Sequence, residues 1–319
     1  MATERMTSAE VLAVNSAEEA IGVIVEKQFQ YPEWQVIPAN PVAKTTYRTL
    51  VRTSLPDVGF RAINVGRERK SPGLEARIVE CKVFDASWEI DKAAATGTDW
   101  GMEAAFNLQR SAHIQAEMKA VAEQVWYGTA ADSNGFVGLT SLADDLAEDT
   151  VVNAGGSTAN TGSSVFLVKL GTDAVSFAWG NDGLIEASPI RPETLYEDGD
   201  VKRKFPGYVQ DIGGWVGLQT TNQASVVRIA NLTADSGNGL DDDLLYTALE
   251  RFHDLNGSNP DAIFMGVRST MQLRQSRVAT NATGAPAPLT YEVGGINNIP
   301  IPVYVTSAIS KTEPLVVEA

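Results

Sequence analysis

Apolar and polar residues alternate through residues 51–90, which is the pattern of strands in a β-ribbon. The phase of this alternation reverses once. The apolar positions are Val79, Cys81 and Val83 before the reversal, and Phe84, Ala86, Trp88 and Ile90 after it. Because one extra residue turns every following side chain to the other face of a strand, we predict a bulge or bend at Val83–Phe84. A Pro-Gly pair in Arg67–Gly73 predicts the turn at the tip of the ribbon.

The chain before the ribbon has a different pattern. Residues 8–29 show a loose amphipathic spacing that predicts one or two short helices. Residues 31–42 contain three prolines in twelve positions, so we expect an extended segment without a core of its own. We interpret residues 1–43 as an arm.

A long helix is predicted after the ribbon. The run from Trp100 to Tyr127 contains no proline, with Asp99 as a candidate N-cap and Gly128 as a candidate residue just past the end. Its apolar residues recur at steps of three and four, which predicts one buried face. These residues are Ile114, Met118, Val121 and Val125.

Short apolar runs follow the helix. Residues 164–170 and 174–179 flank Gly-Thr-Asp, which predicts a hairpin with a three-residue loop. Residues 208–220 and 224–232 predict two further strands. The segment Ala-Asp-Ser-Gly-Asn-Gly at 234–239 predicts a boundary.

The last part of the chain alternates helix and strand. Residues 240–255 predict an amphipathic helix, residues 261–267 a buried strand, and residues 269–277 a short helix. Residues 299–309 predict an edge strand, because their prolines cannot donate to a sheet on both sides. The pattern indicates a small α/β unit.

Length and charge narrow the class of protein. A chain of 319 residues, 44% of them hydrophobic, is long enough for about two folded domains. Its net charge of −15 argues against a dedicated nucleic-acid binder and against docking to anionic membranes. No apolar run approaches the roughly 20 residues of a membrane span.

The single cysteine, Cys81, excludes an intrachain disulfide and a thiolate zinc cluster, and we interpret it as a packed thiol.

Candidates for chemistry are few. The carboxylates of Asp241, Asp242 and Asp243 could bind a divalent cation, but acidic residues in the first turn of a helix are the usual complement of its dipole, and we reject the metal. The histidines His113 and His253 lack an accompanying nucleophile or carboxylate motif. No glycine pattern matches a phosphate-binding loop. We therefore expect no enzyme: no catalytic, cofactor-binding or metal-binding residues, and no cofactor.

The charge of the ribbon contrasts with that of the rest. Residues 44–82 hold nine basic and four acidic residues, a net charge of +5, which leaves −20 elsewhere. A two-stranded ribbon alone is marginally stable in water, so we expect it to lie on an acidic surface of a neighbouring copy. The alternative is a solvated hairpin with ordinary surface charge. The residues that we expect in the intersubunit contact are Arg48, Arg52, Arg61, Arg67, Arg69, Lys70, Arg77 and Lys82.

The order of these segments resembles a known family. The ribbon sequence "VRTSLPDVGFRAINVG", the long helix ending in "VWYG", "NGFVGLTSLAD", "RIANL" and the terminal "GGINNIPIPVYVTSAI" are similar to the major capsid proteins of tailed bacteriophages. The resemblance covers most of the chain. It implies an α+β fold of the Hong Kong 97 type, with an N-arm, an extended hairpin called the E-loop, a P-domain and an A-domain.

The resemblance suggests a division of the chain into four parts. These are an N-arm at 1–43, an E-loop β-hairpin at 44–92, a P-domain at 93–235 with a spine helix at 99–127 and antiparallel strands at 164–232, and a small α/β A-domain at 236–319. Because the A-domain usually follows the spine helix directly, this division implies a permuted order. The alternative is that residues 164–232 form an independent β-domain on the surface.

The resemblance also implies function and partners. We expect a structural subunit that assembles as hexamers and pentamers into an icosahedral phage head enclosing double-stranded DNA without sequence-specific binding. Residues before the extended stretch are too few for a built-in scaffold, so we expect a separate scaffolding protein, together with a portal protein and a decoration or cement protein, and no membrane. We expect the protein in the virion, after assembly in the bacterial host cytoplasm. Lys70 is a candidate for an isopeptide cross-link, although no partner asparagine or assisting glutamate can be matched to it.

Three other interpretations remain open. One is the shell of a protein nanocompartment of the encapsulin type, which has the same fold but encloses protein cargo. Another is a metal-dependent hydrolase that uses Asp241–Asp243. The last is a β-rich tail or decoration protein.

Overall fold

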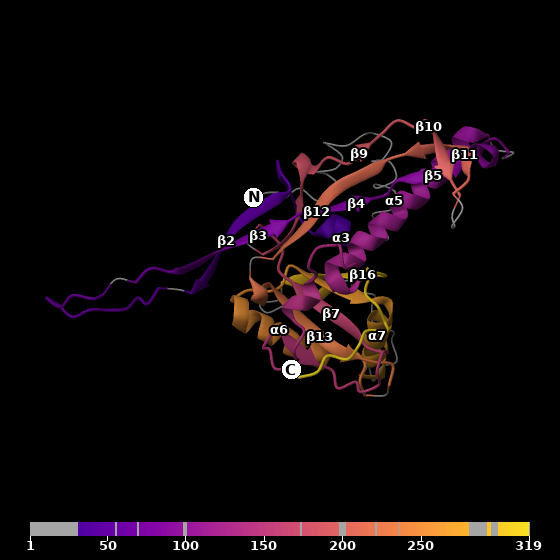
Figure 1. The fold of residues 1–319 in the computed structure, drawn as a ribbon. Coiled ribbons are helices and arrows are strands. Elements are labelled where there is room, and N and C mark those ends of the chain that lie inside the picture. Colours follow the sequence, from indigo (N-terminus) through magenta and orange to yellow (C-terminus); the bar gives the residue numbers. More distant parts are fainter. Residues whose placement is uncertain are drawn as a thin grey trace.

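The structure is a computed structural model (Figure 1). It describes residues 31–54, 56–68, 70–97, 101–172, 174–197, 202–220, 222–235, 237–280, 292–294 and 299–318. The predicted helices at 8–29 lie outside these residues. A body of helices and sheets carries one long ribbon that projects away from it (Figure 1). Among the described residues no helix has the length and apolar character needed to cross a bilayer.

Within the described ranges, the strands form three sheets in the body and one ribbon. The first sheet has the order β1 (Ala39–Pro41), β8 (Val175–Trp179), β12 (Ile212–Thr220) and β4 (Lys82–Asp85), with β9 (Glu186–Ala187) also paired to β12. The second sheet is β10 (Arg191–Tyr196), β11 (Lys204–Gln210) and β5 (Trp88–Asp91). The third is β15 (Glu292–Gly294), β16 (Pro300–Thr306), β14 (Ala262–Gly266), β7 (Ser163–Val168), β13 (Val226–Leu232) and β6 (Val151–Asn153). The ribbon is β2 (Thr46–Ser54) and β3 (Gly73–Glu80).

Helices cover these sheets. The α-helices are α3 (Glu33–Val36), α4 (Lys92–Thr96), α5 (Met102–Tyr127), α6 (Asp242–Asn256) and α7 (Val267–Thr280). Short 3₁₀ turns lie at Gly128–Ala130, Leu139–Leu142, Asn181–Gly183 and Gln223–Ser225. Strand pairing that is mostly antiparallel, with parallel pairs β1–β8, β13–β6 and β14–β16, and helices outside the sheets confirm the predicted α+β class.

The long helix forms as predicted over most of its length. Helix α5 ends at Tyr127, and Gly128 follows with φ 55°, a left-handed backbone that favours glycine. The predicted apolar stripe is buried along its whole length in the main core. The helix begins at Met102 after Gly101, and the predicted N-cap Asp99 lies outside the described residues.

The predicted hairpin at 164–179 is wrong. Strand β7 lies inside the third sheet, between β14 and β13, whereas β8 lies in the first sheet between β1 and β12. Both strands are buried throughout, so each needs a hydrogen-bonded neighbour on both sides. A hairpin with a short loop would have paired them with each other instead.

The predicted boundary near residue 235 does not separate the sheets. The third sheet combines β7 and β13 from before that point with β14 and β16 from after it. The strands of residues 164–232 are therefore divided among all three sheets: β8, β9 and β12 lie in the first, β10 and β11 in the second, and β7 and β13 in the third. The division into P-domain and A-domain, with its permuted order, stays a prediction.

The expectation that residues 31–42 lack a core is also wrong. Trp34 and Ile37 are fully buried in the main core, and the Trp34 indole N–H donates to the Met118 carbonyl at 3.1 Å. Strand β1 pairs with β8 in parallel. The prolines stop a regular strand or helix, but they do not prevent the aromatic and aliphatic residues between them from packing against α5.

The ribbon is shorter than the predicted 44–92. Strand β3 ends at Glu80, and Lys82 and the residues after it pair with β12 and β11 in the body. The predicted reversal of side-chain phase is confirmed, since Cys81 and Phe84 are buried while Val83 is exposed. The break falls at Cys81 rather than at Val83–Phe84, because that is where the chain changes its pairing partner from β2 to β12.

The C-terminal α/β unit forms as predicted, with two differences. Helix α6 and the buried strand β14 are confirmed, and α7 is longer than expected. Strand β16 is not an edge strand, because it lies between β14 and β15. Its two prolines are tolerated there because pairing with β14 starts only at Val303.

Candidate intersubunit surface

The ribbon is held to the body at its root. The Cys81 backbone N–H donates to the Thr45 carbonyl at 2.8 Å, and the buried Cys81 thiol lies 3.5 Å from the Ala178 carbonyl, which confirms a packed thiol. Strand β12 crosses beneath the root at Gly217, where a Cβ would lie 3.1 Å from the Glu80 carbonyl. A small residue there lets the root pack closely on β12.

Regular pairing covers only the first part of the ribbon. Residues from Thr46 to Ser54 pair with residues from Glu80 to Gly73, with one register shift before the last pair. Beyond this point the two arms continue to a distal turn at Ala62–Val65, where the Val65 N–H donates to the Ala62 carbonyl at 3.3 Å. Asn64 adopts a φ of 66°, which asparagine tolerates better than most residues. The predicted turn at Arg67–Gly73 is therefore wrong, since these residues lie on the returning arm.

Large apolar side chains are exposed along the ribbon. Phe60 is fully exposed and Ile63 is 91% exposed. The other exposed apolar residues of the ribbon are Leu50, Val58, Val65, Leu74 and Ile78. An extended apolar patch of this kind marks an interaction surface in soluble proteins. The sequence analysis did not single out these apolar residues, because the same stretch is dominated by its arginines and lysines.

The predicted basic residues do not converge on one point. Arg48, Arg61, Arg67 and Lys70 are exposed along the ribbon, while Arg77 and Lys82 are half-buried at or near its root. The side chains of Arg52 and Arg69 lie outside the described residues. Lys82 belongs to β4 in the body, so its assignment to the ribbon is corrected.

Several of these cations already have partners within the chain. Arg67 pairs with Asp57 at 2.7 Å, and Lys82 pairs with Glu80 at 3.1 Å. Arg77 donates to the Thr220 carbonyl at 3.5 Å. Arg61, beside the exposed Phe60, makes a 3.5 Å contact with the Val65 carbonyl and no shorter one within the part of the chain that the structure describes. The distal turn thus combines an exposed aromatic ring with a weakly bound arginine.

The residues considered for catalysis have structural roles. The Asp241 carboxylate caps α6 by accepting from the Leu244 N–H at 2.9 Å, and Asp242 pairs with Arg277 at 2.7 Å, which confirms the helix-start interpretation. His113 and His253 are half-buried on α5 and α6. The part of the chain that the structure describes contains no group of three or more metal-ligating side chains.

Both the sequence and the fold are similar to those of known proteins. Residues 26–317 match the family described as major capsid protein GP7. A chain in the near-atomic structure of bacteriophage Epsilon15 superimposes with a TM-score of 0.57 at 17% identity, covering 88% of both chains, which shows a shared fold. The capsid of bacteriophage JBD30 gives a TM-score of 0.48 at 9% identity, covering 86% of this chain and 89% of the other. No curated protein matched the sequence.

Proposed function

The chain belongs to the major capsid protein GP7 family, and from this premise we propose that its projecting ribbon lies across a neighbouring subunit of the shell. As a major capsid protein it is a structural subunit of a phage head and a component of the virion. We propose that the subunits assemble as hexamers and pentamers, with the ribbon as the E-loop of the expected fold. In this role the ribbon joins copies of the chain and does not take part in catalysis.

One observation carries the proposal: the distal ribbon exposes large apolar side chains that the body of its own chain does not cover. Burial of apolar surface contributes about 25 cal/mol of free energy per Å². Phe60 and Ile63 do not gain this free energy in the free subunit, where they are exposed, but they can gain it when a second copy buries them. The net charge of +5 on residues 44–82 against −20 elsewhere favours contact between the ribbon of one copy and the body of another. Individual contacts can be weak, because a closed lattice repeats them many times.

The remaining partners follow from the same role. We infer that a separate scaffolding protein guides assembly, that a portal protein replaces one vertex and that a decoration or cement protein binds the finished shell. We infer assembly in the host cytoplasm and enclosure of double-stranded DNA. The net negative charge of the chain supports a shell that does not bind the enclosed DNA tightly. DNA binding is driven by the release of counterions when cationic side chains neutralise phosphates, and a negatively charged protein repels the phosphates instead.

The proposal is tested by hydrogen exchange on free subunits and on shells confirmed by electron microscopy. We expect amides of residues 46–80 to exchange rapidly in the free subunit and to become protected at least tenfold in the shell, because a lone ribbon opens easily. Amides of the buried strand β14 serve as the matched control, and they should be protected in both states. A ribbon that exchanges equally fast before and after assembly would contradict the proposal. Nucleic acid or protein in purified particles distinguishes a phage head from a nanocompartment.

A further inference from the structure

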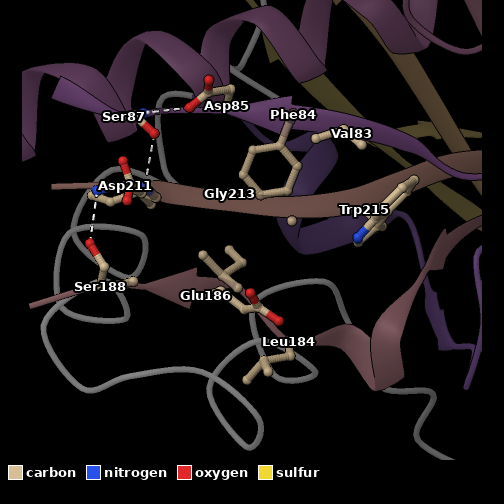
Figure 2. Close-up of a pocket in the computed structure, with 14 residues that line it drawn as sticks. Val83, Phe84, Asp85, Ser87, Leu184, Glu186, Ser188, Asp211, Gly213 and Trp215 are labelled. Carbon is tan, nitrogen blue, oxygen red and sulfur yellow. Dashed lines mark hydrogen bonds between the residues drawn. The ribbon is translucent and has the colours of Figure 1, made fainter.

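A groove on the body lies on the first sheet, where β4, β12 and β9 meet (Figure 2). Its volume is about 670 Å³, within the range of pockets that bind compact ligands. Figure 2 shows Phe84 and Val83 on one side of the β12 segment at Gly213, and Leu184 and Glu186 on the other. The wall residues are Val83, Phe84, Leu184, Ile185 and Trp215, all apolar or aromatic.

Hydrogen bonds fix the polar end of the groove. The Ser87 hydroxyl accepts from the Ile212 N–H at 3.1 Å, and the Ser188 hydroxyl accepts from the Asp211 N–H at 2.9 Å. These contacts join the segments before β5 and before β10 to the start of β12, as the dashed lines of Figure 2 show. The groove is therefore formed before any partner binds, which lowers the cost of binding.

The rim of the groove is acidic. Asp85, Glu186 and Asp211 line it. Asp211 pairs with the exposed Arg191. Asp85 accepts from the Ser87 N–H and Glu186 from the Asn181 amide, and among the described residues neither carboxylate has an ion-pair partner. The rim thus keeps two negative charges for an incoming cation.

The distal turn of the ribbon has the complementary character. It presents the exposed Phe60 and Ile63 with Arg61 between them. The ribbon points away from the body, so the turn cannot reach the groove of its own chain (Figure 1). Every copy carries one turn and one groove, which is the arrangement that closes a ring by repeated head-to-tail contacts.

We propose that the groove lined by Val83, Leu184 and Trp215 receives the Phe60 side chain of a second copy, with Arg61 of that copy against Glu186. The inference rests on the proposed function and specifies the surface on which the ribbon lies. The apolar ring fills the groove, and the guanidinium compensates the acidic rim, so both the shape and the charge of the turn contribute to recognition.

Photo-cross-linking in assembled shells tests the contact. A benzophenone amino acid replaces Phe60, and shells are assembled from mixed ¹⁵N-labelled and unlabelled subunits so that mass spectrometry separates cross-links within a chain from cross-links between chains. We expect cross-links between copies at residues 184–188 or 211–215. The same amino acid at the exposed Tyr246 on α6 is the control and should not label these segments.

Each other outcome overturns the inference. Cross-links to a different part of a neighbouring copy, or to a different protein, would refute the groove but leave the ribbon in an intersubunit contact. Cross-links within one chain only, or none, would refute both the groove and the proposed function.

Charge exchange gives a second measurement. We expect Arg61→Glu or Glu186→Arg alone to raise the protein concentration needed for shell assembly about tenfold, and the double variant to restore it. The control Glu250→Arg reverses an exposed acid on α6 and should not be rescued by Arg61→Glu. A double variant that assembles no better than the worse single variant would overturn the pairing.

Discussion

At the scale of single residues, a buried ion pair holds the C-terminal segment to the body. Arg228 on β13 and Glu313 lie 2.9 Å apart, with 6% and 3% of their side chains exposed. The Ser164 hydroxyl and the Tyr127 hydroxyl also donate to the Glu313 carboxylate, at 2.5 and 2.6 Å. Burial, together with the neighbouring Glu313 carboxylate, raises the pKa of Tyr127, so this hydroxyl remains a donor. The sequence around Arg228 and around Glu313 did not predict that these two side chains form an ion pair.

Removing one member of this pair leaves a buried charge without compensation. We expect Arg228→Met or Glu313→Gln to lower the free energy of unfolding by about 3–5 kcal/mol, measured by urea denaturation of the free subunit. The double variant should lose clearly less than the sum of the single losses, because no uncompensated charge remains. Arg203→Met is the control, since Arg203 and Glu197 form an exposed 3.8 Å pair, and it should cost at most about 1 kcal/mol. Additive single losses would contradict this account.

Glu117 on α5 makes the stability of the folded subunit depend on pH. Burial, followed by the carboxylates of Asp85 and Asp132, raises the pKa of Glu117 from 4.5 to about 7. Between these values the folded chain keeps a proton that the unfolded chain has lost, so stability falls as the pH rises through this window.

A neutral side chain at position 117 should remove this fall. We expect Glu117→Gln to match the wild type near pH 4 and to be more stable by roughly 2–3 kcal/mol above pH 7, since one pKa unit corresponds to about 1.4 kcal/mol. Urea denaturation across this pH range measures it. Glu123→Gln, which removes an exposed pair with Lys119 on the same helix, is the control. A variant whose stability falls with pH as steeply as that of the wild type would show that Glu117 is not the group responsible.

At the scale of elements, the end of α5 is fixed by a close approach of two glycines. Gly128 has a left-handed φ, and a Cβ on it would lie 2.1 Å from the Gly138 backbone nitrogen. Gly257 ends α6 with a similar φ of 64° but has open space around it. The sequence predicted a terminating glycine at 128, and the folded chain adds the steric requirement.

These two positions separate backbone strain from steric overlap. We expect Gly257→Ala to lower the free energy of unfolding by about 1 kcal/mol, the cost of a Cβ at positive φ. Gly128→Ala should cost at least about 2 kcal/mol more, because the overlap is with backbone and cannot be relieved by a rotamer change. Denaturant unfolding of both variants gives the comparison. Equal losses would show that the 128–138 contact adjusts freely.

At the scale of the whole molecule, charge and apolar surface are separated along the chain. The ribbon carries positive charge and exposed apolar residues, while the remainder carries a net −20. The basic, apolar ribbon of one subunit is complementary to the acidic body of a second copy. It cannot make this contact with the body of its own chain, because the ribbon extends outward (Figure 1).

Contacts between opposite charges weaken with salt. The screening length falls from about 10 Å at 0.1 M to about 3 Å at 1 M, so we expect shell assembly to need a higher protein concentration as salt increases. Light scattering against protein concentration measures this. The variant Arg61→Gln should show a shallower dependence than the wild type. Assembly that improves with salt would indicate that apolar contacts dominate and that like-charge repulsion between bodies is the larger electrostatic effect.

The sequence by itself determined the local elements. Period-two and period-3.6 patterns, the acidic first turn at Asp241–Asp243 and the terminating Gly128 predicted the ribbon, α5, α6 and β14, because these depend on neighbours within a few positions. The basic character of the ribbon was also readable, whereas its exposed apolar residues and its distal turn at Asn64 were not identified.

Only the tertiary structure decided which strands share a sheet. Strands β7 and β8 are adjacent in sequence, yet they lie in different sheets, and Trp34 and Ile37 enter the core despite the prolines around them. The physical reason is that a fully buried strand is stabilised equally by any well-packed neighbour on each side, so its own pattern does not specify the partner. That choice depends on the packing of residues more than a hundred positions apart, such as Trp34 against Trp179.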